Sequence, residues 1–175
     1  MAIKKDKIIL NYDTVWFKTF MDSYDVKFYN REVFVTNGLR GRSDIFMQML
    51  GNIGAYARTV NFDKDVDVIV FSDYVIDDLK HGFQNDFIID LEKRINASNT
   101  PYRKLKFTTE ALLLDFLKTR ATGSLRQNQK SLKEEKNSIE LNISLEHAIE
   151  RDEQMLHLLK IYKDSASEPK QIELF

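Results

Sequence analysis

Val68-Ile69-Val70-Phe71 decides the fold, because these four consecutive residues are all apolar and mostly β-branched. A short run of this kind is typical of a parallel β-strand that is buried on both faces. Glu32-Val33-Phe34-Val35-Thr36 is likewise β-branched and aromatic, and the Asn37-Gly38 that follows it is a turn signal. The two stretches therefore predict two strands of one sheet.

Further strands and helices are expected around these two stretches. Strands are predicted at residues 32–36, 56–60, 66–71 and 104–107, and helices at residues 43–50, 86–95 and 109–117. Ser43 is the expected N-cap of the first helix, with Gly51 and Gly54 as its stop, and Thr108 or Thr109 is the expected cap of the last. This order within residues 27–120 predicts an α/β fold, a three-layer domain around a small, four-stranded, mainly parallel sheet.

Three segments flank that domain. Residues 1–26 are expected to form an N-terminal helical arm whose apolar residues recur at three and four positions; packing on the domain is favoured over binding a partner. Residues 121–163 predict a mostly helical extension, with a helix over 144–163. Residues 138–145 alternate like a strand, and their structure stays open. Residues 164–175 are expected to be a flexible tail, with a polar linker before its last five residues.

Composition excludes several classes of protein. The 175 residues carry 26 Lys and Arg against 27 Asp and Glu, so the net charge of -1 gives no general attraction to nucleic acid. The chain has no cysteine, which excludes disulfides and thiolate chemistry. No apolar run has the length of a membrane-spanning helix, and the first residues lack a signal-peptide pattern. We therefore expect a soluble, cytoplasmic protein.

Catalytic patterns are not found. The three histidines lie in different segments without metal-ligand spacing, and no serine stands in a nucleophile-elbow motif. Asp63, Asp65 and Asp67 occupy every second position, as the first ligands of a calcium loop do. The Gly and Glu that follow in such a loop are missing, so a solvated turn is favoured over a metal site. Residues 38–42 fit neither a P-loop nor a dinucleotide fingerprint. We expect no enzyme activity, no cofactor and no bound metal.

Residues 29–119 resemble a BRCT domain. The resemblance rests on four junctions: Arg31 to Leu39 at the end of the first strand, Met49 to Ala55 at a Gly-rich turn, Asp67 to Phe71 in the apolar third strand, and Lys104 to Leu113 at the last strand and helix. Two features depart from the family pattern. The usual Trp of the last helix is replaced by Leu112, Leu113 and Phe116, and the segment from Asp73 to Asn85 is longer than expected.

The resemblance also implies a phosphate-binding site at the end of the first strand. Backbone N–H groups beside a helix N-terminus, together with a guanidinium, form a sensible anion site. The alternative is an Asn-Gly turn with a solvated arginine pair, and this alternative is favoured. The residues implied are Thr36, Asn37, Gly38, Arg40, Arg42 and Lys80.

The last five residues, Gln171-Ile172-Glu173-Leu174-Phe175, resemble the pentapeptide by which bacterial polymerases and repair proteins bind the DNA sliding clamp. Gln171 offers a donor and an acceptor to a polar subsite, while Leu174 and Phe175 suit an apolar pocket. The alternative is that the segment packs on its own domain. The clamp interpretation is favoured over that alternative.

Together these features predict a non-enzymatic adaptor in DNA replication or repair. Its tail would bind the sliding clamp, and its BRCT-like domain would bind a further partner by protein–protein interaction. A second hypothesis is a phosphate-dependent module that binds DNA ends or a phosphorylated protein. A third is a structural, oligomerising domain. The partner of the folded domain, the pathway and the oligomeric state are not determined by the sequence.

Overall fold

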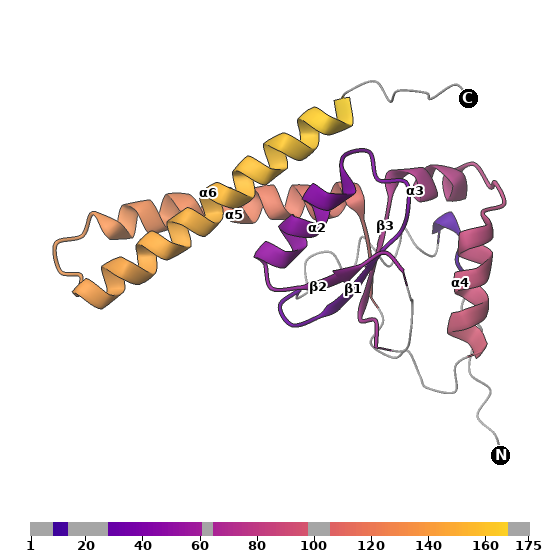
Figure 1. The fold of residues 1–175 in the computed structure, drawn as a ribbon, viewed down its shortest axis with the longest axis horizontal. Coiled ribbons are helices and arrows are strands. Elements are labelled where there is room, and N and C mark those ends of the chain that lie inside the picture. Colours follow the sequence, from indigo (N-terminus) through magenta and orange to yellow (C-terminus); the bar gives the residue numbers. More distant parts are fainter. Residues whose placement is uncertain (1–8, 14–27, 61–64, 98–105, 168–175) are drawn as a thin grey trace, which may run out of the picture.

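The computed structural model describes residues 9–13, 28–60, 65–97 and 106–167 (Figure 1). Its centre is a four-stranded, all-parallel sheet in the order β2-β1-β3-β4. The strands are β1 (Glu32–Val35), β2 (Tyr56–Arg58), β3 (Val68–Phe71) and β4 (Lys106–Thr109). The α/β class and the four strands are as predicted, although β1, β2 and β3 are each shorter than expected and β4 extends to Thr109.

The central position of β1 and β3 in the sheet explains why their sequences are almost entirely apolar. In the register of β1 and β3, Val33 pairs with Val68 and Val35 with Val70. Every residue of β3 is buried, because the strand has a neighbour on each side and helices on both faces. A strand in this environment is apolar throughout, which is why its sequence shows no alternation.

Helices cover both faces of the sheet, which gives three layers (Figure 1). On one face lie α2 (Ser43–Asn52), α5 (Glu110–Leu132) and α6 (Ile139–Ser167). On the other lie α3 (Asp73–Lys80) and α4 (Asp86–Ala97). Neighbouring side chains of each strand point to opposite faces, so the core divides into two clusters. The first cluster includes Val33, Val35, Val68 and Val70, and the second includes Phe34, Ile69, Phe71 and Phe107.

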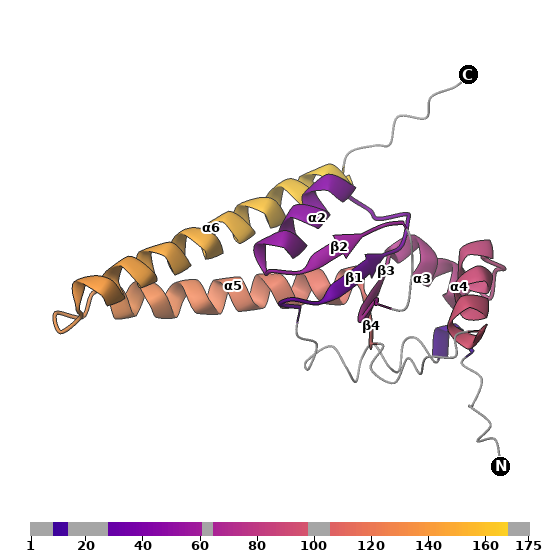
Figure 2. The ribbon, with the colours of Figure 1, turned by 60° about the horizontal axis from the view of Figure 1, so that its bottom comes forward.

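Helices α5 and α6 form a long hairpin that extends beyond the sheet (Figure 2). The predicted cap is confirmed, since the Thr109 hydroxyl accepts a hydrogen bond from the Leu112 N–H at 3.2 Å. However, α5 continues past Leu117 to Leu132, so the boundary predicted at residue 120 falls inside a helix. Residues 118–132 include good helix formers and no proline, and Ala121 packs in the core.

The open question about residues 138–145 is resolved as helix. The Ser138 hydroxyl accepts from the Leu141 N–H at 3.1 Å, and α6 then runs from Ile139 to Ser167. The alternating apolar residues at the start of α6 are exposed, and Ile139 has 80% of its surface accessible. Residues 164–167, which were predicted to begin the polar linker, belong to the last turn of α6.

Two helix ends differ from expectation. Arg42, not Ser43, is the N-cap of α2, and it makes no side-chain capping hydrogen bond. Gly51 lies inside α2, while Gly54 follows its end with a φ of +80° and donates to the Gly51 carbonyl at 3.0 Å.

Helix α3 was not predicted at all, and it occupies most of the segment from Asp73 to Asn85 that is longer than expected after the third strand.

The N-terminal arm is described only at residues 9–13. Leu10 is buried in the second core cluster, and its N–H donates to Glu92 Oε2 on α4 at 3.0 Å. This short piece therefore packs on the domain. The rest of the predicted arm, and the tail from residue 168, lie outside the described residues.

Candidate functional site

The carboxyl ends of β1 and β3 lie side by side, and the chain leaves them toward opposite faces of the sheet. After β1 it passes to α2 on one face, and after β3 it enters α3 on the other. In open α/β sheets, ligands bind in the crevice at such a point of divergence. The residues predicted to bind phosphate begin here, so this edge is the first candidate site.

The end of β1 is tied to the start of α3 by side-chain hydrogen bonds. Buried Thr36 accepts from the Ser72 N–H at 2.8 Å through its hydroxyl, and the Ser72 hydroxyl donates to the Asn37 carbonyl at 2.6 Å. Gly38 has a φ of +94°, and a Cβ added there would lie 2.7 Å from Cβ of Tyr74. The turn therefore requires glycine, for its backbone angle and for space.

A carboxylate of the chain itself fills this crevice. Glu110, the first residue of α5, is only 1% exposed. It accepts the Arg40 N–H at 3.1 Å, the Asp73 N–H at 3.2 Å and the Tyr162 hydroxyl at 2.8 Å. Backbone N–H groups at a loop and at a helix start are the donors that an anion site offers. Here they hold Glu110.

Burial raises the pKa of Glu110, and the hydrogen bond from Tyr162 and those from the backbone of Arg40 and Asp73 oppose that rise. Burial also raises the pKa of Tyr162 well above its usual range, while the N–H of Gly41 opposes the rise. The phenol therefore remains protonated at all ordinary pH values and serves as the donor of the pair.

The same contacts fix the end of α6 to the loop after β1. The Gly41 N–H donates to the Tyr162 hydroxyl at 3.1 Å, and the Arg42 N–H donates to Ser165 Oγ at 2.9 Å. A Cβ at Gly41 would lie 2.7 Å from Cε2 of Tyr162, so the loop and the helix are in close contact. The Tyr162 ring also packs on Phe46, with 5.5 Å between ring centroids.

The three predicted cationic residues do not gather on the crevice. Arg40 forms an ion pair with Asp73. Arg42 forms one with Asp44, two residues along the chain, and this contact lowers the pKa of Asp44. Lys80 lies in the last turn of α3, about 10 Å along the helix from its first residue. The structure thus brings Thr36, Asn37, Gly38 and Arg40 together and leaves Lys80 apart.

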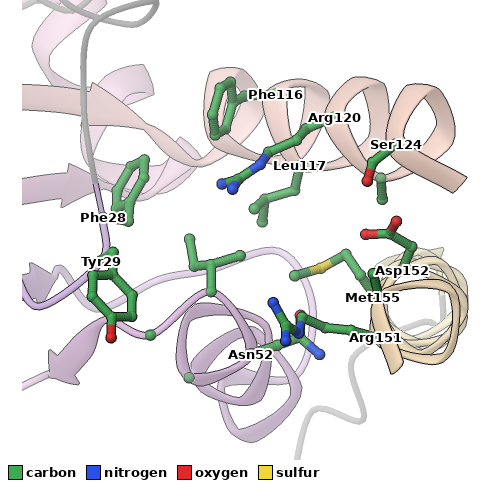
Figure 3. Close-up of a pocket in the computed structure, with 15 residues that line it drawn as sticks. Phe28, Tyr29, Asn52, Phe116, Leu117, Arg120, Ser124, Arg151, Asp152 and Met155 are labelled. Carbon is green, nitrogen blue, oxygen red and sulfur yellow. The ribbon is translucent and has the colours of Figure 1, made fainter. Parts of the chain in front are cut away.

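A second candidate site is a cavity of about 890 Å³ between α5, α6, the end of α2 and the residues before β1 (Figure 3). Phe28, Phe116 and Met155 supply apolar walls. Arg120 enters from α5 and Arg151 from α6, and neither forms an ion pair with another described residue (Figure 3). The combination of apolar walls and two exposed guanidinium groups suits an acidic ligand that also carries apolar groups.

The cavity also has an acceptor side. Asp152 on α6 lines it near Ser124 of α5 (Figure 3), and its Oδ2 is buried without a hydrogen-bond partner among the described residues. Buried polar atoms are normally satisfied. Asp152 Oδ2 is thus an unsatisfied acceptor beside the cavity.

The acidic residues between β2 and β3 show no metal arrangement. Asp63 lies outside the described residues, and Asp67 Oδ2 accepts the Glu32 N–H at 3.0 Å. Within the described ranges, no group of three or more His, Asp or Glu side chains is placed to hold a metal ion. Nor is any helix there long and apolar enough to cross a membrane.

The sequence did not indicate the Glu110–Tyr162 pair. A glutamate at the first turn of a helix is common, because the helix dipole favours it there. Tyr162 lies within the helix predicted over residues 144–163, and its ring packs in the core against Phe46. The sequence feature that could have indicated it is the position of Glu110, directly after the threonine that ends β4, at the edge of the sheet where ligands bind. The pentapeptide Gln171–Phe175, the other predicted site, lies outside the described residues.

The protein-family models, curated proteins and solved structures that were compared with this chain gave no match.

Proposed function

We propose that this chain is a cytoplasmic, non-enzymatic adaptor of DNA replication or repair, tethered to a bacterial sliding clamp by Gln171–Phe175. The observation that carries the proposal is the position of this pentapeptide. Helix α6 ends at Ser167, and the motif begins four residues later, after a polar stretch that contains Pro169. All five positions fit the clamp-binding pattern.

The energetics of such a peptide suit a tether. Burying Leu174 and Phe175 contributes roughly 1.5–3 kcal/mol each. Ordering five residues costs about 1 kcal/mol or more per residue, which offsets much of that gain. The expected dissociation constant is about micromolar. A contact of this strength is useful because it raises the local concentration of whatever the folded domain binds.

The anchoring of α6 supports this role. Tyr162 and Ser165 attach its last turns to the loop after β1, so the tail leaves the domain from a fixed point. From Ser167, the four residues up to Gln171 reach at most about 14 Å. A clamp bound to the tail would therefore be held close to the domain.

The order of strands and helices supports a BRCT-like domain, and the cavity between α5 and α6 is a suitable surface for its further partner. Arg120 and Arg151 favour an acidic or phosphate-bearing segment, and the apolar walls favour side chains beside the charges. The oligomerising hypothesis rests on exposed apolar residues at the start of α6, namely Ile139, Leu141 and Ile143.

The second hypothesis, phosphate-dependent binding at the end of β1, meets an obstacle. A phosphate at this edge must displace Glu110 from the N–H groups of Arg40 and Asp73. We therefore expect this edge of the sheet to bind 5′-phosphorylated DNA, or a phosphopeptide, no better than the unphosphorylated twins.

Salt dependence distinguishes the proposals. Clamp binding through apolar side chains should change little as salt rises, whereas DNA binding should weaken steeply. Steep, salt-sensitive DNA binding together with no clamp binding would replace the adaptor by the DNA-binding hypothesis.

A further inference from the structure

A groove of about 490 Å³ lies between α5 and the last three turns of α6. Its walls are apolar: Ala111 and Leu114 come from α5, and Leu156, Leu159 and Ala166 come from α6. Ala111 and Leu114 are three residues apart. Leu156 and Leu159 are also three apart, and Ala166 follows Leu159 by seven, so each set lies on one face of its helix. The leucines are only half-buried, because α5 and α6 leave this side uncovered.

Lysines stand along the same groove. Lys118, Lys160 and Lys163 line it and are exposed, and none of them forms an ion pair with another residue in the described part of the chain. Asp115 is the one exposed acidic residue among the described residues that line it. An apolar floor with a mainly basic rim fits an extended peptide that has both apolar and acidic side chains.

We infer that this groove is the docking site of the chain's own residues 171–175, bound in cis. The segment has the matching chemistry, with Ile172, Leu174 and Phe175 for the apolar walls and Glu173 for the lysines. Glu168 adds a second negative charge close to the end of α6. Gln171–Phe175 thus has two alternative positions, the groove and an external partner.

Length and position support this occupant. The groove reaches Ala166, one residue before α6 ends, so residues 168–170 provide the reversal of direction. From Ala166 back to Leu156 is about 15 Å along the helix axis. Five extended residues cover about 16 Å. A tail that folds back antiparallel to α6 would therefore end beside Leu156 and Leu114.

Cis docking would lower the apparent affinity of the tail for an external partner. A short linker gives an effective concentration in the millimolar range, so even a weak groove contact keeps much of the tail docked. The apparent affinity for an outside partner then falls in proportion to the fraction of free tail. We expect a two- to tenfold reduction. The docking itself does not depend on the proposed function, but this regulatory consequence does.

Photo-crosslinking in the full chain tests the docking. Phe175→p-benzoylphenylalanine should crosslink within one molecule to Leu114, Lys118, Leu156 or Leu159, as mapped by mass spectrometry. Lys160→Glu/Lys163→Glu should lower the yield at least threefold. Lys130→Glu/Lys133→Glu, the same charge change at the distal end of α5, should leave the yield unchanged. Circular dichroism checks that both variants are folded.

Three results would overturn the inference: crosslinks between isotopically distinct copies, which assign the groove to a second copy; crosslinks outside the groove; or a yield unaffected by Lys160→Glu/Lys163→Glu. A clamp titration separates this inference from the proposed function. Crosslinks in the groove without clamp binding would support the cis docking and contradict the proposed clamp tether. Clamp binding without crosslinks in the groove would support the clamp tether and contradict the cis docking. If both hold, Lys160→Glu/Lys163→Glu should bind the clamp two- to tenfold more tightly.

Discussion

The hydroxyl of Tyr162 donates a 2.8 Å hydrogen bond to the carboxylate of Glu110, 52 residues earlier in the chain. This bond joins the start of α5 to the end of α6 at the carboxyl edge of the sheet. The Glu110 side chain meanwhile holds the N–H groups of Arg40 and Asp73. One buried carboxylate thus connects the loop after β1, the start of α3 and the last turns of α6, and it occupies the crevice where an external anion would otherwise bind.

Glu110→Ala should destabilise the fold. The change leaves the N–H groups of Arg40 and Asp73 without an acceptor, and a buried unsatisfied donor costs about 1–3 kcal/mol. Removing a desolvated carboxylate recovers part of this cost, so we expect a net loss of about 2 kcal/mol. Urea unfolding measures it.

Glu110→Gln is the matched control, because its amide oxygen still accepts from the backbone. We expect it to lose less than about 1 kcal/mol. Equal losses for Ala and Gln would show that the backbone contacts to Glu110 contribute little.

Stability should depend on pH through Glu110. Its pKa in the folded protein is raised above the ordinary 4.5, so between about pH 4.5 and the raised value the folded state binds more protons than the unfolded state. The free energy of unfolding therefore falls as pH rises through this window. Because Asp44, whose pKa is lowered, acts in the opposite direction at more acidic pH, the wild type is compared with Glu110→Gln. A difference between the two that stays constant across the window would contradict the assignment.

Tyr162→Phe should separate the hydrogen bonds of this residue from its packing. The ring remains against Phe46, while the bonds to Glu110 and from Gly41 are lost. We expect a loss of about 1–2 kcal/mol in chemical unfolding. Tyr74→Phe, at a side chain that is 62% exposed, should change stability by less than about 0.5 kcal/mol. Similar values for both variants would mean that the Tyr162 hydroxyl does not stabilise the fold.

Gly41→Ala and Gly51→Ala should have opposite effects. A Cβ at Gly41 would lie 2.7 Å from the Tyr162 ring and 2.8 Å from Ser165 Oγ, so the loop and α6 must move apart, at a cost of about 1–3 kcal/mol. A Cβ at Gly51 meets no atom within 4 Å and lies inside α2, where alanine is favoured by about 0.5–1 kcal/mol. Thermal unfolding of the two variants provides the comparison. A stable Gly41→Ala variant would contradict the tight contact described here.

The sheet could be predicted from the sequence because its information is local. Two apolar, β-branched runs predicted the central strands, and the run at Val68–Phe71 indicated a parallel strand that is buried on both faces. The full lengths of α5 and α6 could not be predicted. The outer turns of α5 carry few apolar residues, and the start of α6 alternates like a strand although it is an exposed helix.

The candidate site was harder to predict, since it depends on tertiary contacts. The sequence placed Thr36, Asn37 and Gly38 at the correct edge of the sheet. It gave no indication that Glu110, 70 residues after Arg40, would enter the same crevice, or that Tyr162 would reach it from α6. Two lysines on α6 and one on α5 likewise look like a solvated surface until the hairpin places them along one groove.

The most direct test of the central claim is a fluorescence-polarisation titration of the labelled full chain with a bacterial sliding clamp, beside the Leu174→Ala/Phe175→Ala variant. The account predicts saturable binding with a dissociation constant of about micromolar, weakened at least about tenfold in the variant. Absence of binding at clamp concentrations on the order of 100 µM, or equal binding by both proteins, would contradict the clamp tether.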